Sequence, residues 1–225
     1  FGSLTIAGTY NATSGVTEIT SNTGGGSSSA LAFSQMGTGT FTHNSGTVKF
    51  SMGADYAQII SGSATVQGPF YDVDHNRSSA SYHLYIKSDM TVESEYDNVQ
   101  GYTTLYGPNT LTLGKSGSAA GSYKATGSGL RFYDNDSSNY AKVYGASVER
   151  PFVYTGIAPD IDTYSTNASY TAWKWGDIQV NLTGDYQGGT LRLDGDMEFD
   201  AVTVNSGDTL DLNGQRMECS GEFTN

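Results

Sequence analysis

Oxygen-bearing side chains at alternate positions are the first feature of the sequence that could do chemistry. Asp72, Asp74 and Asn76 begin a stretch that opens like a calcium-binding loop. An EF-hand requires glycine at its sixth position and glutamate at its twelfth, where this sequence has Arg77 and His83. The EF-hand is therefore excluded, and only a looser calcium site is left as a candidate.

A second acidic stretch contains Asp134 and Asp136 on either side of an asparagine. At both stretches the ordinary alternative is a turn, because Asp and Asn side chains hydrogen-bond to their own backbone there. We favour the turn in both cases. The sequence thus predicts no cofactor, with calcium as the candidate metal.

Paired carboxylates could instead make a glycosidase. The candidate pairs are Glu93 with Glu95 and Asp194 with Asp196. Alternation along a strand would put each pair on one face, with Cβ atoms roughly 6–7 Å apart, which catalysis tolerates. The sequence gives no reason for a raised pKa at these acids, and acidic residues on an outer face commonly keep strands soluble. We therefore expect no enzymatic activity.

Other catalytic motifs are incomplete. Gly114-Lys115-Ser116 resembles the end of a phosphate-binding loop, but Asn109 stands where that loop needs its first glycine. The three histidines, His43, His75 and His83, lack the spacing of a zinc site. These absences favour a protein without chemistry.

Aromatic residues could bind glycans by ring stacking. The candidates are Tyr164, Tyr170, Trp173 and Trp175. Trp173 and Trp175 alternate, which predicts that both indoles lie on one strand face. The alternative is that both lie in the core or at a subunit interface, where Trp is enriched. We favour core or interface, because this region has few other large apolar residues.

Charge limits the partners of the chain. Its 225 residues carry a formal net charge of -12, so nucleic acid and anionic membrane surfaces should repel it. No apolar run is long enough for a transmembrane helix. The single cysteine, Cys219, allows no intrachain disulfide.

Alternation of apolar and polar residues dominates the chain and predicts an all-β fold. Helix-period patterns are nearly absent, whereas stretches such as Tyr82–Ile86 and Leu111–Leu113 are typical of short strands. Turn sequences, including Asn44–Gly46 and Asn205–Gly207, separate these stretches.

A repeat in the last third predicts stacked coils. Thr190–Gly195 and Thr209–Gly214 both read T-L-x-L-x-G, at an offset of 19 residues. A unit of this size with two or three short strands suits one coil of a β-solenoid, a parallel β-helix-like fold. We therefore expect Leu191 to stack on Leu210. A β-sandwich built from similar hairpins is the alternative for residues 60–176.

Three regions follow from this pattern. Residues 1–150 are expected to be an all-β region with Gly/Ser-rich loops. Residues 151–176, where the Tyr and Trp candidates lie without a clear repeat, are expected to be an irregular insertion or junction. Residues 177–225 are expected to form the coils.

The strand-turn-strand phrases also carry a resemblance. Gly39–Phe50 followed by Gln58–Gly62, and the later Ser206–Gly214, resemble repeats of large bacterial surface proteins and marine phage structural proteins. The resemblance covers about a fifth of the chain and implies an architecture and a setting, not a catalytic activity. The Tyr-rich stretch between residues 63 and 176 departs from the repeat.

Together these features favour a non-enzymatic structural protein of a virion surface, such as a fibre, decoration or tail component. Its expected partners are copies of itself and other virion or surface proteins. A bacterial cell-surface adhesin that binds glycans is the first alternative, and a polysaccharide-degrading β-helix enzyme is the second.

Overall fold

The computed structural model of the chain describes its backbone over most of its length. The described residues are 1–23, 31–51, 58–79, 82–106, 109–115, 121–125, 130–134, 142–145, 152–156, 162–165, 173–175, 178–180, 190–192, 197–199, 201–212, 214 and 216–225. They form twenty-seven short strands and no helix, so within this part of the chain the all-β prediction is confirmed. No helix there is long and apolar enough to span a bilayer.

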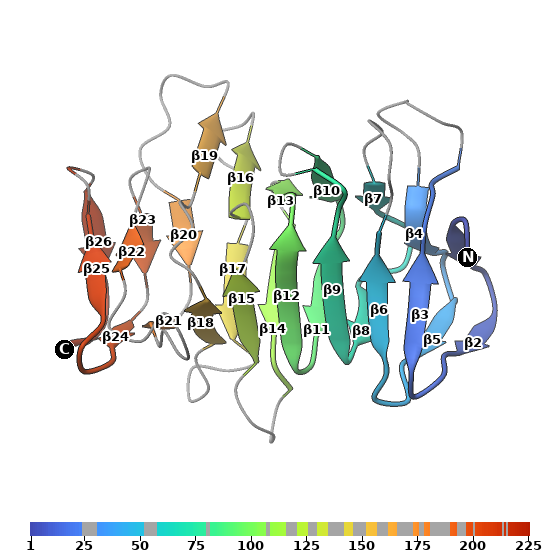
Figure 1. Cartoon of the computed structure of the whole chain (residues 1–225), viewed down its shortest axis with the longest axis horizontal. Helices are drawn as coiled ribbons and strands as arrows, with labels where there is room; N and C mark the ends of the chain where they lie inside the picture. The colour runs from blue at the N-terminus through green and yellow to red at the C-terminus, as the bar shows by residue number, and fades with distance from the viewer. Residues whose placement is uncertain are drawn as a thin grey trace.

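Nearly all strands belong to three sheets, each ordered along the chain (Figure 1). The first sheet contains β1 (Leu4–Ile6), β4 (Leu31–Gln35), β7 (Gln58–Ile60), β10 (His83–Ile86), β13 (Tyr102–Tyr106), β16 (Leu130–Asp134) and β19 (Asp162–Ser165). The second contains β8 (Gln67–Phe70), β11 (Met90–Val92), β14 (Thr110–Leu113), β17 (Lys142–Gly145), β20 (Trp173–Trp175), β23 (Met197–Phe199) and β26 (Met217–Cys219).

The third sheet runs through almost the whole chain. It contains β3 (Val16–Ile19), β6 (Thr47–Phe50), β9 (Asp72–Asn76), β12 (Glu95–Gln100), β15 (Ser122–Ala125), β18 (Phe152–Gly156), β21 (Ile178–Val180), β24 (Val202–Val204) and β27 (Phe223–Thr224). Two further pairs are β2 (Thr9–Asn11) with β5 (Thr40–Thr42), and β22 (Thr190–Arg192) with β25 (Thr209–Asp211).

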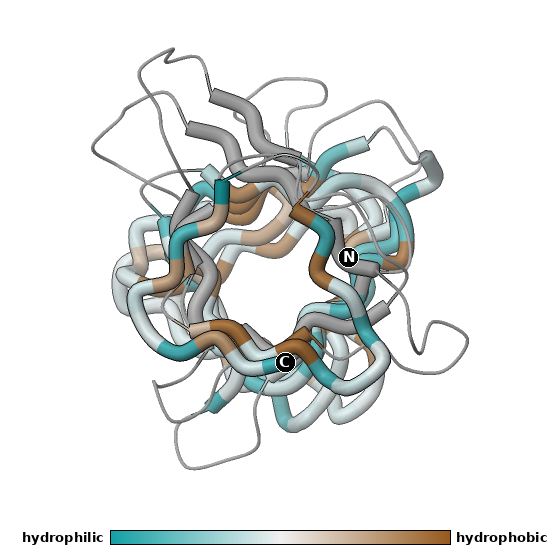
Figure 2. The backbone as a smooth tube through the Cα atoms, turned by 90° about the vertical axis from the view of Figure 1, so that its left-hand side faces the viewer, coloured by the Kyte–Doolittle hydropathy of each residue, from teal (hydrophilic) through white to brown (hydrophobic). Residues whose placement is uncertain are grey.

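Every described pairing is parallel and joins two strands that lie three places apart in the chain, so the chain visits the sheets in turn. Seen along the long axis, the strands surround a common centre (Figure 2). Parallel strands stacked in this way are consistent with a β-helix or solenoid-like fold. The antiparallel hairpins of the sandwich alternative are not found among the described strands of residues 60–176, which pair in parallel.

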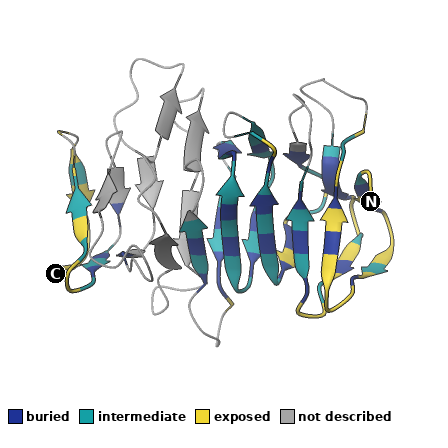
Figure 3. Ribbon diagram, viewed as in Figure 1, coloured by how far each residue is buried: buried dark blue, intermediate teal, exposed yellow. Residues whose placement is uncertain are grey.

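Alternation explains why these sequences form strands with one buried face. In β10, Leu84 and Ile86 are fully buried while His83 and Tyr85 are half-buried, and the same rhythm runs along β9 and β12 (Figure 3). Each fully buried aliphatic or aromatic side chain contributes about 1.5–3 kcal/mol. The period of two thus fixes which face of each strand lies inside.

The predicted stacking of the repeat is confirmed. Leu191 pairs in register with Leu210, and Met197 with Met217. Strands on both sides of residues 150 and 176 belong to the same sheets, and β18, β19 and β20 fall between these boundaries. The division into three regions stays a prediction.

Candidate functional site

The outer face of the third sheet carries the first calcium candidates. In β9, Asp72, Asp74 and Asn76 alternate with the buried Val73 and His75. The predicted turn is therefore wrong at this stretch, because inward-facing apolar and aromatic residues at every second position favour a strand over the turn preference of Asp and Asn.

Asp72 and Asp74 contact other residues of the third sheet. Asp74 lies 3.8 Å from the Lys49 ammonium, and an Asp72 oxygen accepts a hydrogen bond from the Glu95 backbone N–H at 3.1 Å. No group of three or more His, Cys, Asp or Glu side chains that could hold a metal occurs among the described residues. Asp134 ends β16, and Asp136 lies outside the described part of the chain.

Burial changes the acidity of two carboxylates on this face. Loss of solvent raises the pKa of Asp74; nearby Lys49 partly offsets this shift, and Asp97 adds to it. Burial likewise raises the pKa of Glu95, against the influence of Lys124. The expectation that no acid of the glycosidase pairs has a raised pKa is therefore wrong for Glu95.

Glu93 and Glu95, which the sequence offers as a glycosidase pair, have different interaction partners. Glu93 follows β11 and its Oε2 accepts a hydrogen bond from Lys115 Nζ at 2.9 Å and lies 3.2 Å from His43 Nε2. Glu95 begins β12 and accepts a longer hydrogen bond from the Ser122 hydroxyl, at 3.4 Å. Asp194 and Asp196 lie outside the described residues.

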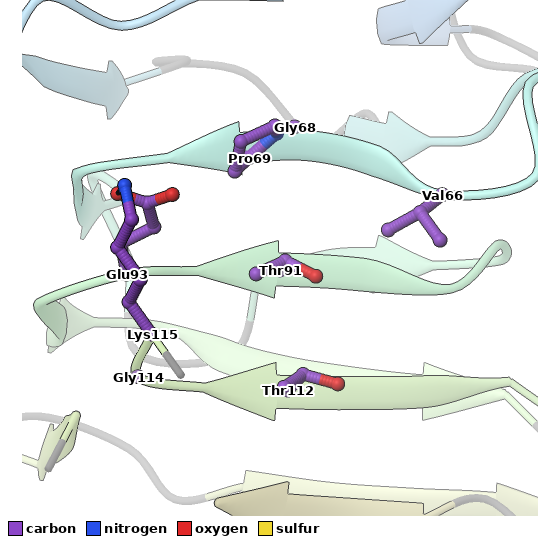
Figure 4. A pocket seen from close by; sticks show the side chains of 8 residues that line it. All are labelled: Val66, Gly68, Pro69, Thr91, Glu93, Thr112, Gly114 and Lys115. Carbon is purple, nitrogen blue, oxygen red and sulfur yellow. Dashed lines mark hydrogen bonds and ion pairs between the residues drawn. The ribbon is translucent and has the colours of Figure 1, made fainter. Parts of the chain in front are cut away.

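A shallow groove of about 450 Å³ lies on the outer face of the second sheet beside Glu93 (Figure 4). Thr91 and Thr112 form its floor; they pair in register on β11 and β14 and alternate with buried neighbours. Position 68 requires glycine, because its φ is +97° and a Cβ there would lie 2.8 Å from the Thr91 carbonyl oxygen.

Gly114 also lines the groove, where the chain leaves β14. Its φ is +108°, a value that favours glycine, and its N–H donates to the Val92 carbonyl at 2.7 Å. The chain therefore turns after β14 and places Lys115 beside Glu93, which follows the adjacent strand β11.

The aromatic candidates that the structure describes lie in two strands that are consecutive in the chain but belong to different sheets. Trp173 and Trp175 form β20 and pair in register with Met197 and Phe199, and Tyr164 lies in β19 opposite Tyr133. Tyr170 lies outside the described residues. Whether these residues serve the core, an interface or a glycan stays a prediction.

Sequence reasoning missed an aromatic cluster on the first sheet. The His83 ring stacks on the rings of Tyr85 and Tyr102, with centroids 5.2 and 5.1 Å apart. Lys87 Nζ lies 4.7 Å from the Tyr106 ring centroid, within cation–π range. Alternation in residues 82–86 signals one strand of this cluster, but only the register brings Tyr102 and Tyr106 beside it.

A polar network inside the sheets was also missed. His75, Tyr96, Asn98 and Thr103 are fully buried, as is Tyr123. Thr103 Oγ1 lies 3.0 Å from both His75 Nδ1 and the Tyr96 hydroxyl, and Asn98 donates to the Tyr123 hydroxyl at 3.1 Å.

Burial sets the titration of this network. Loss of solvent lowers the pKa of His75 to about 3, with the Arg77 charge adding to the shift, so this imidazole is neutral at physiological pH. Burial also raises the pKa of Tyr96 and Tyr123. The network is therefore a set of neutral hydrogen-bonding groups.

Comparison of the chain with protein-family models, with curated proteins and with solved structures found no match.

Proposed function

We propose that the chain is a β-solenoid segment of a structural protein of a virion surface, and that it works mechanically, not catalytically. The observation that carries this proposal is the continuity of the third sheet from β3 to β27, in which every pairing is parallel. In such a stack each coil packs only on its neighbours and fixes their position, so we expect the function of the chain to be the shape that it provides.

Side-chain ladders support a rigid shape. On the outer face of the third sheet, Glu18 pairs in register with Lys49, and Lys49 with Asp74. Asp97 follows Asp74 in the same row, and it accepts a hydrogen bond from Lys124 of the next strand at 2.8 Å. Each exposed pair contributes at most about 1 kcal/mol, but opposite charges in neighbouring strands disfavour a slipped register.

Open strand edges support self-association. In the described pairings, β25, β26 and β27 each have one neighbour. Met217 and Cys219 pack against the core yet are only partly buried, and Phe223 is 48% exposed. Parallel edges of this kind accept another coil, from a longer chain or from a second copy.

The setting of the protein is inferred from its surface and from its resemblance to repeats of phage and bacterial surface proteins. A fibre, decoration or tail component has to be polar and stay soluble, and a net charge of -12 suits that role. Its partners would be copies of itself and other virion or surface proteins.

The experiment is light scattering and small-angle scattering of the isolated chain over a concentration series. We expect assemblies that grow in length at constant cross-section. Met217→Lys with Phe223→Lys would place charges at the open edge and yield shorter species, whereas Val66→Lys, at a site 39% exposed on the side of the stack, would not. A monodisperse monomer at all concentrations would contradict self-association.

A further inference from the structure

The groove on the second sheet has a floor of a particular chemistry. Thr91 and Thr112 present side chains from adjacent strands, with Pro69 and Val66 beside them as apolar walls (Figure 4). From Pro69 on β8 to Thr112 on β14 the groove crosses three strands, which spans about 10 Å at the usual strand spacing. A ligand there meets alternating hydroxyl and C–H surfaces over the length of a disaccharide.

An ion pair between Glu93 and Lys115 lies at one end of the groove (Figure 4). Both contacts to the carboxylate, from His43 and from Lys115, go to Oε2. Oε1 has no hydrogen-bond partner among the described residues, and it is not one of the buried unsatisfied atoms. Glu93 is therefore held in place with one oxygen open to a ligand.

Lys115 supplies the complementary donors. Its side chain is 53% exposed, and one of its three N–H bonds is used by Glu93. A carboxylate oxygen that accepts and an ammonium that donates, side by side, match two neighbouring hydroxyl groups of one sugar ring. Hydrogen bonds to charged groups contribute about 1.5–3 kcal/mol each.

We propose that this groove binds a neutral saccharide, with a vicinal diol held between Glu93 Oε1 and Lys115 Nζ and the next sugar lying over Thr91 and Thr112. The site differs from the Tyr and Trp candidates of the sequence, and it does not depend on how the chain assembles. Glu93 lowers the affinity for anions, and the hydroxyl floor leaves little for a wholly apolar ligand.

The test is a glycan array of neutral and acidic oligosaccharides probed with the labelled chain, followed by calorimetry on the sugars retained. Glu93→Gln and Lys115→Met should each weaken binding at least about tenfold, and Thr112→Val a few-fold. Lys124→Met is the matched control, because it breaks the same kind of lysine–carboxylate pair on the third sheet. It should leave binding unchanged.

Lys115→Met removes an exposed side chain, so loss of binding in this variant reports on the site and not on folding. Circular dichroism of each variant confirms this point. Three results would overturn the proposal: no neutral sugar retained on the array, binding unaffected by Glu93→Gln and Lys115→Met, or inorganic phosphate competing at the same concentration as the sugar.

Discussion

The interior of the stack changes character along its length. Around β4, β5 and β8 it is aromatic: the rings of Phe33, Phe41 and Phe70 lie with centroids 4.8–5.6 Å apart. Around β9, β12 and β15 it holds the polar network of His75, Tyr96 and their neighbours. The described strands pair in parallel in both places, so the stack accommodates either kind of interior.

The two regions therefore stabilise the fold in different ways. The aromatic interior stabilises by area and packing, independent of pH. The polar interior makes directed hydrogen bonds that depend on protonation. Substitutions in the two regions should therefore differ in size and in pH dependence.

The largest effect is expected in the aromatic region. Phe70→Ala removes a fully buried ring that packs on Phe33 and Phe41, and should lower the free energy of unfolding by about 3–5 kcal/mol. Urea unfolding at pH 7.5 measures it. Phe223→Ala, at a ring 48% exposed, is the control and should cost much less.

Acid should weaken the polar region next. The pKa of His75 is about 3 in the folded chain and near 6.5 unfolded, so the unfolded chain binds the extra proton between these values. Its contribution to stability is complete above pH 6.5 and falls by about 1.4 kcal/mol per unit as the pH drops toward 3.

Urea midpoints at pH 7.5 and pH 4.5 test this slope. The raised pKa values of Asp74 and Glu95 act in the opposite direction, since their protonation favours the folded state. His75→Gln should flatten the acid loss, and His83→Gln should change it much less, because the His83 charge is the smallest of the three causes that lower the His75 pKa. An unchanged slope in His75→Gln would show that other groups control acid stability.

A smaller effect is expected from one hydroxyl of the network. Tyr123→Phe keeps the stacking on Tyr96 but leaves Asn98 without this acceptor, and should cost about 1–3 kcal/mol. Tyr10→Phe, a half-buried ring stacked on Phe41, is the matched control and should be close to neutral. Equal losses in both variants would mean that the Asn98 hydrogen bond contributes nothing.

The smallest effect should come from the outer ladder. Lys49→Met removes a partly exposed pair with Asp74 and should change the free energy of unfolding by less than about 1 kcal/mol. The effect should shrink further in 1 M salt. A larger, salt-independent loss would point to packing of the lysine stem.

Strand periodicity and the T-L-x-L-x-G repeat predict the all-β fold and the stacking of Leu191 on Leu210, because both depend on local spacing alone. The three-sheet arrangement of residues 60–150 could not be predicted, since the number of residues between paired strands varies there and no motif repeats. In the groove, Glu93 contacts Lys115, which is 22 positions away in the sequence, and His43, which is 50 positions away. Only the pairing of strands that are distant in the sequence brings them together, so no pattern in the sequence marks the groove.

The central claim is that the coils stack at a constant spacing, and spin-label distances along one row of the third sheet test it most directly. In a Cys219→Ser background, pairs at Thr47 with Thr203, Thr47 with Thr224 and Val16 with Thr224 are separated by six, seven and eight strand spacings. Diluting labelled chain with unlabelled chain removes contacts between copies.

We predict backbone separations of about 29, 34 and 38 Å, one strand spacing apart from each other. A constant increment of about 4.8 Å between the three pairs would support the stacked-coil account. Distances that fail to increase in this order, or that are all short, would show that β3 and β27 do not lie at opposite ends of one sheet, and would contradict it.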